Sequence, residues 1–330
     1  MNRFLDRARG SKALGLLKKI ELDKYGPFIA LVILFVISSL ASPYFLQVRN
    51  ITNILRQISY TGIIALGMTF VIISGGIDLS VGSGTALMGA IAIFTLNFLG
   101  GGPWAIVAAI VVAVIAGAAA GALNGIVITK WRVAPFIVTL GTMSIFRSLT
   151  LFMTNAGVLR SGSVMYQKVG MGYFLGLPNP VWIMLILAAL FHVVLYHTRY
   201  GRYVCAVGSN ERVAAYAAIK TAWIKFYGYV IVGATVGLTS ILLSSRMNSI
   251  GSTNAGSGYE LDAIAAVIIG GTSLSGGSGS IVGTLIGAVI LGIVNNMLNM
   301  MGVSPYLQGT VKGLVIIGAV LIQRGRRRTA

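Results

Sequence analysis

Long apolar stretches separated by short polar connections dominate the pattern of residues along this chain. A run of about 20 apolar residues is long enough to cross the hydrocarbon core of a bilayer as a helix. Ten such runs occur, of which the third and the eighth are short and glycine-rich, so these two are predicted to be broken or re-entrant. If neither crosses the membrane, the chain has eight full crossings instead of ten. The ten predicted spans are residues 27–45, 58–77, 82–99, 103–129, 134–154, 179–197, 225–246, 261–274, 280–301 and 306–323.

The composition supports an all-α polytopic membrane protein and excludes soluble classes. Apolar residues make up 56% of the 330 residues, another 43 are Gly, and only 10% are charged. Typical soluble domains carry about 25% charged residues. The single Cys205 excludes an internal disulfide, and one Cys with two His argues against a zinc site built by this chain.

The basic residues predict the orientation of the chain. Lys and Arg outnumber Asp and Glu by 25 to 7, a net charge of +18, and basic residues favour cytoplasmic connections. Counted along the predicted spans, they concentrate on the side that holds both termini, which we therefore expect to be cytoplasmic. The predicted parts are a basic segment at 1–26, a transmembrane domain at 27–323 and a basic tail at 324–330. The basic start is too long for a secretory signal, so the first span is expected to remain uncleaved.

A ten-residue glycine-rich sequence occurs twice. Residues 75–84 read GGIDLSVGSG and residues 270–279 read GGTSLSGGSG, with 7 of 10 positions identical. Repeated glycine-interrupted segments in two halves of a transporter point to the substrate path, because unwound backbone at membrane depth must line a cavity or be buried in protein. The alternative is that Gly and Ser serve close helix packing or tight turns. The predicted topology puts both segments on the inner side, as a parallel repeat.

Polar residues inside apolar sequence are the candidates for a translocation path, because they are costly in a membrane. The carboxylates either line the path or relay protons, or they sit at the interface as helix caps and ion-pair partners. The arginine, in the middle of the fifth span, is expected to be functional or paired instead of facing lipid. The candidates are Asp78, Ser80, Asn124, Arg147, Glu260, Asp262 and Ser275.

The connection between the sixth and seventh spans has the most distinctive sequence. Residues 198–219 read TRYGRYVCAVGSNERVAAYAAI. Asn210 is predicted to cap the start of a short helix after a turn at 208–209, with Glu211 in the first turn, where the helix dipole favours an acid. The helix either fits a partner's groove through a small-residue face or is an ordinary amphipathic connector. The small residues of that face are Ala214, Ala215 and Ala218.

The chain shows no site for ATP. The glycine-rich stretch at 270–284 invites a phosphate-loop interpretation, but that loop needs Lys-Ser or Lys-Thr after its last glycine, and neither pair follows this stretch. A dinucleotide fingerprint needs a βαβ unit, which a membrane span does not supply. We therefore expect no catalytic residues and no enzymatic activity in this chain.

Four motifs, in order between about residues 45 and 320, resemble the permeases of ribose/galactose-type ABC sugar importers, members of the branched-chain-amino-acid/sugar permease superfamily. GGIDLSVGS stands at 75–83, PFIVTLGT at 135–142, and YELDAIAA with GGTSLSGGSG at 259–279. Ala218 stands where the family usually has Gly, which implies a slightly different turn. The connecting loop matches the family at Thr198, Gly201, Arg202, Ala206, Gly208, Asn210, the Ala214–Ala215 pair and Ile219.

The resemblance implies a subunit that forms the path for a monosaccharide across the bacterial cytoplasmic (inner) membrane, without nucleic acid as a partner. It implies a second permease copy or paralogue, an extracytoplasmic sugar-binding protein, and a separate ABC ATPase that docks on a coupling loop near 198–224. This chain would bind no cofactor, because the partner ATPase uses ATP and Mg. The residues that the resemblance assigns to coupling are Gly208, Asn210, Glu211, Ala214, Ala215, Ala218 and Ile219.

Three alternative functions differ in what they require of the sequence. An ion-coupled secondary transporter needs titratable groups at mid-membrane, where only Asp78 clearly lies, and it leaves the connecting loop unexplained. A membrane enzyme needs clustered His, Asp or Cys, of which there are too few. A permease of the same superfold for a branched-chain amino acid or nucleoside is the third alternative, because fold alone does not determine cargo.

Overall fold

The computed structural model describes residues 22–304, 307–314 and 317–318. Residues 307–314 are also helical. The elements in chain order are α2 (Leu22–Ala41), α3 (Val48–Ile73), α4 (Val81–Phe98), α5 (Pro103–Lys130), α6 (Pro135–Met153), β1 (Val158–Arg160), α7 (Gln167–Met171), β2 (Tyr173–Phe174), β3 (Leu177–Pro178), α8 (Asn179–His197), α9 (Arg199–Ser209), α10 (Glu211–Tyr216), α11 (Thr221–Met247), β4 (Ser249–Gly251), α12 (Tyr259–Ile269) and α13 (Ile281–Met300).

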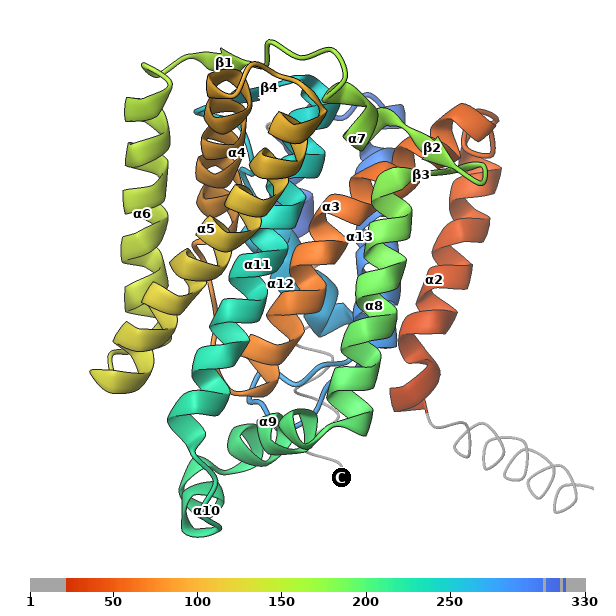
Figure 1. Cartoon of the computed structure of the whole chain (residues 1–330). Helices are drawn as coiled ribbons and strands as arrows, with labels where there is room; N and C mark the ends of the chain where they lie inside the picture. Colours follow the sequence, from red (N-terminus) through yellow and green to blue (C-terminus); the bar gives the residue numbers. More distant parts are fainter. Residues whose placement is uncertain (1–21, 305–306, 315–316, 319–330) are drawn as a thin grey trace, which may run out of the picture.

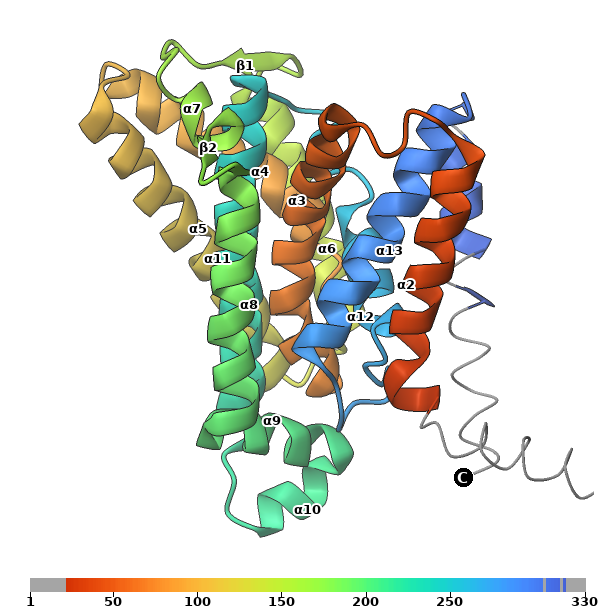
Figure 2. The same ribbon diagram turned by 90° about the vertical axis from the view of Figure 1, so that its right-hand side faces the viewer.

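The long helices run side by side in one bundle, and the short elements cover its two ends (Figure 1). Helices α9 and α10 lie at one end, here called the α10 end. The opposite end, here called the β1 end, carries α7 and two small antiparallel sheets. One sheet pairs β1 with β4 and joins segments about 90 residues apart in the chain, and the other pairs β2 with β3. Figure 2 shows that α2 starts at the α10 end and that α3 returns to it.

The helices confirm an all-α polytopic membrane protein. Among the described residues, seven helices are long and apolar enough to cross a membrane. The predicted short eighth span is α12, whose 11 residues rise only about 16 Å, half of a bilayer core. It ends at Ile269 instead of the predicted 274, because Gly270 and Gly271 follow and Gly271 takes a φ of +89°, outside the helical region.

The largest boundary error concerns the second span, which was predicted from residue 58. Helix α3 begins ten residues earlier, at Val48, so Arg49 and Arg56 belong to the helix and not to a connection. The Arg56 side chain is buried: it donates to the Met171 carbonyl at 3.1 Å and lies 4.7 Å from the centre of the Tyr173 ring. The boundary was misplaced because the partners of this buried arginine lie in a distant segment, so its local sequence resembles that of a polar connection.

Two further helices begin several residues earlier than the predicted spans. Helix α2 begins at Leu22, inside the basic segment predicted at 1–26, and α11 begins at Thr221 instead of 225. Residues 1–21 and the predicted tail at 324–330 lie outside the described residues.

Helices α5 and α11 pack closely enough for their backbones to touch. Gly117 and Gly121 on α5 face Gly233 and Gly237 on α11, and a Cβ atom at any of the four would overlap backbone atoms of the other helix. The two glycines of each helix are four residues apart, so they lie on the same face of that helix. This contact places α11 at the centre of the bundle, against α3 and α4 as well as α5.

Two non-helical segments interrupt the helices inside the bundle. Residues 74–80 rise from the end of α3 to the start of α4, which lies within the bundle (Figure 1). Residues 252–258 enter from the β1 end and reach the level of Arg147 in α6, which donates to the Ser252 carbonyl. The starts of α4 and α12 meet, because a Cβ at Gly82 would overlap the Glu260 side chain.

The repeated glycine-rich sequences lie at the same end of the bundle, as predicted. The Gly277 backbone N–H of the second copy donates to the Ile73 carbonyl, next to the first copy, at 2.9 Å. Only the first copy belongs to an interruption inside the bundle, since the second interruption is 252–258. The sequence repeat, at 75–84 and 270–279, therefore does not identify the two interruptions inside the bundle, at 74–80 and 252–258.

Candidate functional site

Three of the candidate path residues form a closed polar cluster at the start of α4. The Asp78 carboxylate accepts hydrogen bonds from the Ser80 backbone N–H at 2.8 Å and from the Ser80 hydroxyl at 2.6 Å. The Asn124 amide of α5 donates to the Ser80 hydroxyl at 3.0 Å and to Asp78 at 3.5 Å. All three side chains are buried, and the neighbouring cavity measures only about 10 Å³. In this conformation the cluster closes the end of a helix and leaves no room for a solute.

An open polar cleft of about 500 Å³ lies beside this cluster, between α6 and the loop before α12. Its size falls within the range of small-molecule pockets, about 300–1,000 Å³. Hydroxyl groups and two opposite charges line it, a set that can donate to and accept from the hydroxyls of a polar solute. The lining residues are Ser83, Met143, Ser144, Arg147, Ser148, Leu151, Thr253, Ser257 and Glu260.

Arg147 and Glu260 reach the cleft from different elements. The Arg147 guanidinium donates to the carbonyls of Ser252 at 2.7 Å and Ala255 at 3.1 Å, so it holds the turns at residues 252–258 against α6. Glu260 lies in the first turn of α12, where the helix dipole favours a carboxylate. Both side chains are only partly buried.

The sequence analysis missed the hydroxyl residues of this cleft. Ser144, Arg147 and Ser148 stand three and four residues apart, so they share one face of α6. That spacing was a usable signal for a polar stripe on an apolar span. Thr253 and Ser257 had no such signal, because they lie in a loop whose position depends on the Arg147 contacts.

The remaining path candidates lie elsewhere. The Asp262 carboxylate is buried and pairs with the Lys312 ammonium at 2.9 Å, which ties α12 to the helix at 307–314. Ser275 lies in the loop between α12 and α13 at the α10 end, 3.1 Å from the Ser273 hydroxyl. The candidate set is therefore divided among a closed cluster, an open cleft, an ion pair and a loop.

The predicted cap of the short helix is confirmed. The Asn210 side-chain oxygen accepts from the backbone N–H groups of Arg212 and Val213, both at 3.1 Å, and α10 follows with Glu211 in its first turn. Glu211 pairs with Lys225 of α11. The predicted turn at 208–209 is wrong, because both residues continue the last turn of α9.

The predicted small-residue face of α10 is divided between the core and the surface. Ala214 is buried, whereas Ala215 and Ala218 are exposed. The exposed side of α10 carries larger apolar groups, since Tyr216 is 89% and Val213 60% exposed. A neighbouring cleft of about 840 Å³ is rimmed by charged residues of three segments: Arg132, Glu211, Arg212 and Lys225.

Three segments distant in sequence meet beneath this surface. Gly208, near the end of α9, packs against the Ile73 carbonyl and the Gly277 backbone so tightly that a Cβ would overlap both. Cys205, one turn earlier, is half-buried, and burial raises the pKa of its thiol, which keeps it protonated. The α9–α10 unit is thus in direct contact with the second glycine-rich loop and with the end of α3, from which the first glycine-rich loop begins.

The family model and similar known proteins indicate the same kind of protein. Residues 50–320 match the family model described as branched-chain amino acid transport system / permease component. The ribose import permease protein RbsC of Bacillus subtilis is 48% identical over 93% of this chain and 96% of its own length. The Escherichia coli K12 protein of the same name is 46% identical over 91% and 93%. The D-allose transport system permease protein AlsC of Escherichia coli K12 is 38% identical over 92% of each chain. No solved structure matches this chain significantly.

Proposed function

This chain belongs to the branched-chain amino acid transport system / permease component family, and from this premise we propose how its geometry serves the import of a sugar. It is a permease subunit of an ABC importer for a monosaccharide and a multi-pass protein of the bacterial inner membrane. The non-sugar cargo of the alternative hypothesis is not favoured, because the relatives that match almost the whole chain are named as sugar permeases.

We propose ribose as the cargo. The observation that carries this assignment is the difference in identity between relatives of stated substrate: 48% and 46% for two ribose permeases against 38% for a D-allose permease, all over more than nine tenths of the chain. Since the fold alone does not determine cargo, the greater similarity to ribose permeases is the specific support.

We further propose that the cleft between α6 and α12 forms the wall of the translocation path. Polar groups exposed to lipid are costly, yet Ser144 and Ser148 are exposed on a helix whose apolar stretch is only 22% buried. A second permease copy, identical or related, that covers α6 would remove this cost and enclose the cleft. Arg147 and Glu260 would then offer hydrogen bonds to sugar hydroxyls along a narrow polar channel.

The partner ATPase, in this proposal, docks on α10 and the neighbouring charged cleft, so the α10 end is cytoplasmic. The concentration of basic residues on the predicted inner side supports this orientation. ATP and Mg are used by that partner, and a sugar-binding protein delivers ribose at the β1 end. Because α9 contacts the end of α3 and the second glycine-rich loop, a movement of the docked ATPase can reach the interior of the bundle.

The test is ribose uptake by proteoliposomes that contain the permease with its ATPase and binding protein. Replacing Ser144 and Ser148 together with Leu removes two hydroxyls and narrows the cleft, so we expect at least a tenfold loss of uptake with the ATPase still bound. Ser39→Leu on α2, outside the cleft, is the matched control and should transport normally. Unchanged uptake by the double variant would show that the path lies elsewhere. Transport of D-allose in preference to ribose would contradict ribose as the cargo.

A further inference from the structure

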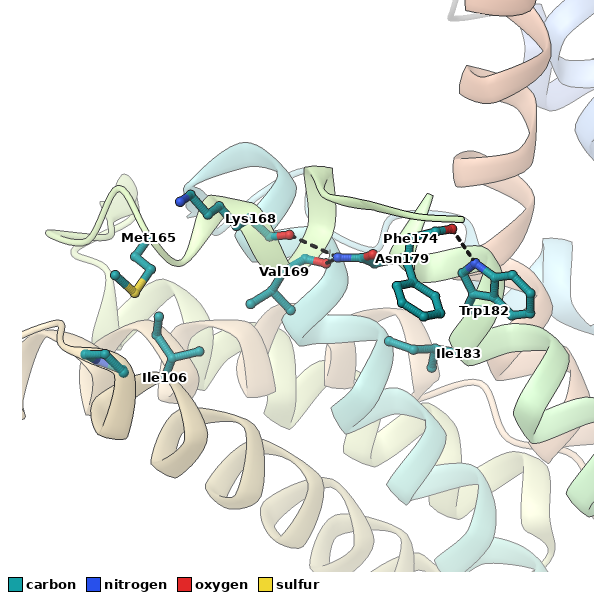
Figure 3. A pocket seen from close by; sticks show the side chains of 9 residues that line it. Ile106, Met165, Lys168, Val169, Phe174, Asn179, Trp182 and Ile183 are labelled. Atoms are coloured by element: carbon teal, nitrogen blue, oxygen red, sulfur yellow. Dashed lines mark hydrogen bonds between the residues drawn. The ribbon is translucent and has the colours of Figure 1, made fainter. Parts of the chain in front are cut away.

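A largely apolar groove of about 610 Å³ lies at the β1 end, beneath α7 and between the first turns of α5 and α8 (Figure 3). Ile106, Val169, Phe174 and Ile183 supply its apolar walls, and Trp182 closes one side. The two helices that flank it are mostly unburied, with 28% of the apolar stretch of α5 and 33% of that of α8 covered by protein. The groove therefore opens to the outside of the bundle, where a membrane protein meets lipid.

The short helix above the groove is anchored from three sides. The Asn179 amide donates to the Lys168 carbonyl at 3.2 Å and to the Val169 carbonyl at 3.4 Å. The Trp182 indole N–H donates to the Phe174 carbonyl at 2.8 Å, as Figure 3 shows. The hydroxyl of the buried Tyr166 lies 2.7 Å from the Ser244 hydroxyl of α11. The groove is thus preformed and does not depend on a ligand for its shape.

Lys168, at the rim of the groove, forms no ion pair with a carboxylate of the described residues. Lys168 is exposed on α7, and Figure 3 shows its ammonium group pointing away from the apolar floor. The sequence contains no Asp or Glu between Asp78 and Glu211, so the helices and loops from α4 to α9 carry none. Among the described residues, the ion pairs involve Lys225 and Lys312 but not Lys168. The described part of the chain therefore leaves the positive charge of Lys168 available to an external anion.

We propose that this groove binds one anionic phospholipid. The phosphate of the head group meets the Lys168 ammonium, and an acyl chain lies against the apolar walls between α5 and α8. Tryptophan is favoured at the level of lipid head groups, and a lysine stem lies along apolar surface while its charge reaches outward. Trp182 and Lys168 occupy these two positions at the mouth of one groove.

Quenching of Trp182 fluorescence by brominated lipids tests the proposal. Phe replaces the other three tryptophans, Trp104, Trp131 and Trp223, and the protein is reconstituted in phosphatidylcholine vesicles with brominated phosphatidylglycerol or brominated phosphatidylcholine. We expect roughly a fivefold preference for phosphatidylglycerol, from one lysine near the surface. Lys168→Gln should reduce the preference to about one, whereas Arg160→Gln, an exposed cation at the same end but outside the groove, should preserve it.

Equal quenching by the two lipids in the parent protein would overturn the proposal. A preference that survives Lys168→Gln, or one that Arg160→Gln lowers equally, would overturn it as well, since either shows a general surface charge. A second measurement avoids the tryptophan substitutions: phosphatidylglycerol that co-purifies in mild detergent should fall several-fold in Lys168→Gln and not in Arg160→Gln. Ribose uptake is no part of either readout, so these results are independent of the proposed function.

Discussion

Ala218, which stands where the family usually has Gly, has a backbone conformation that is unfavourable for alanine. Its φ is +60°, in the left-handed region that costs an L-residue about 1–2 kcal/mol. The backbone N–H groups of Ala218 and Ile219 donate to the carbonyls of Ala215 and Ala214, the pattern of a helix end that usually has Gly at this position. Ala218 therefore adopts a left-handed conformation that a glycine would adopt without this strain.

A larger side chain at this position should disturb the coupling surface. Ala218→Val places a β-branched residue at positive φ, and we expect ribose-stimulated ATP hydrolysis to fall about tenfold if about 1.4 kcal/mol more strain displaces α10. Ala218→Gly should retain or raise activity. Ala217→Val is the matched control, because Ala217 is equally exposed and has a φ of −80°. Equal losses in the two valine variants would show that side-chain size, and not backbone angle, decides the effect.

At the scale of elements, the glycine faces of α5 and α11 determine how the bundle closes. The four glycines have no Cβ atom at the points where the helices approach most closely, so the two backbones make direct dispersion contacts there. The sequence analysis noted that Gly and Ser allow close packing but did not identify which helices pair. Glycines at four-residue spacing occur on several spans, and only the assembled bundle shows which faces meet.

Filling this contact should destabilise the whole bundle. Gly117→Val forces α5 away from α11, with an expected cost of at least 1–3 kcal/mol, because close-packed cores do not absorb extra methyl groups. The measurement is the thermal unfolding midpoint of the purified protein in detergent. Ala119→Val, two residues away on the exposed side of α5, should leave the midpoint nearly unchanged. A similar small shift for both variants would contradict the packing argument.

At the scale of the whole molecule, residues near 73, 208 and 277 converge at the α10 end. The Gly277 N–H donates to the Ile73 carbonyl, and Gly208 is pressed against both. The proposed docking surface is therefore in contact with the end of α3, four residues before the loop reaches Ile77, and with the loop between α12 and α13.

Gly208→Ala should separate these three segments. We expect loss of ribose-stimulated ATP hydrolysis and of uptake by at least tenfold, while the protein still inserts in the membrane. Gly141→Ala on α6 is the control, since a Cβ there meets no other atom within 4 Å. Normal stimulation in Gly208→Ala would mean that the junction does not transmit the movement of the ATPase, and loss of membrane-inserted protein would make it a folding contact only.

The sequence by itself determined the class of the protein, most of its helices and the capped start of α10. These features depend on local chemistry: apolar length sets the spans, and a side-chain oxygen at Asn210 satisfies the first N–H groups of α10. It also placed the two glycine-rich copies at one end. The four family motifs pointed to a sugar permease, which the comparisons with known proteins confirm.

Only the tertiary structure decided where the polar residues lie relative to one another. Asp78 and Asn124 close a cluster, Asp262 finds Lys312, and Arg147 brings the loop before α12 against α6 to open a cleft. Each of these contacts joins residues at least 40 positions apart. A buried polar group must find a partner, but the sequence does not say which one, because that choice depends on how the helices pack.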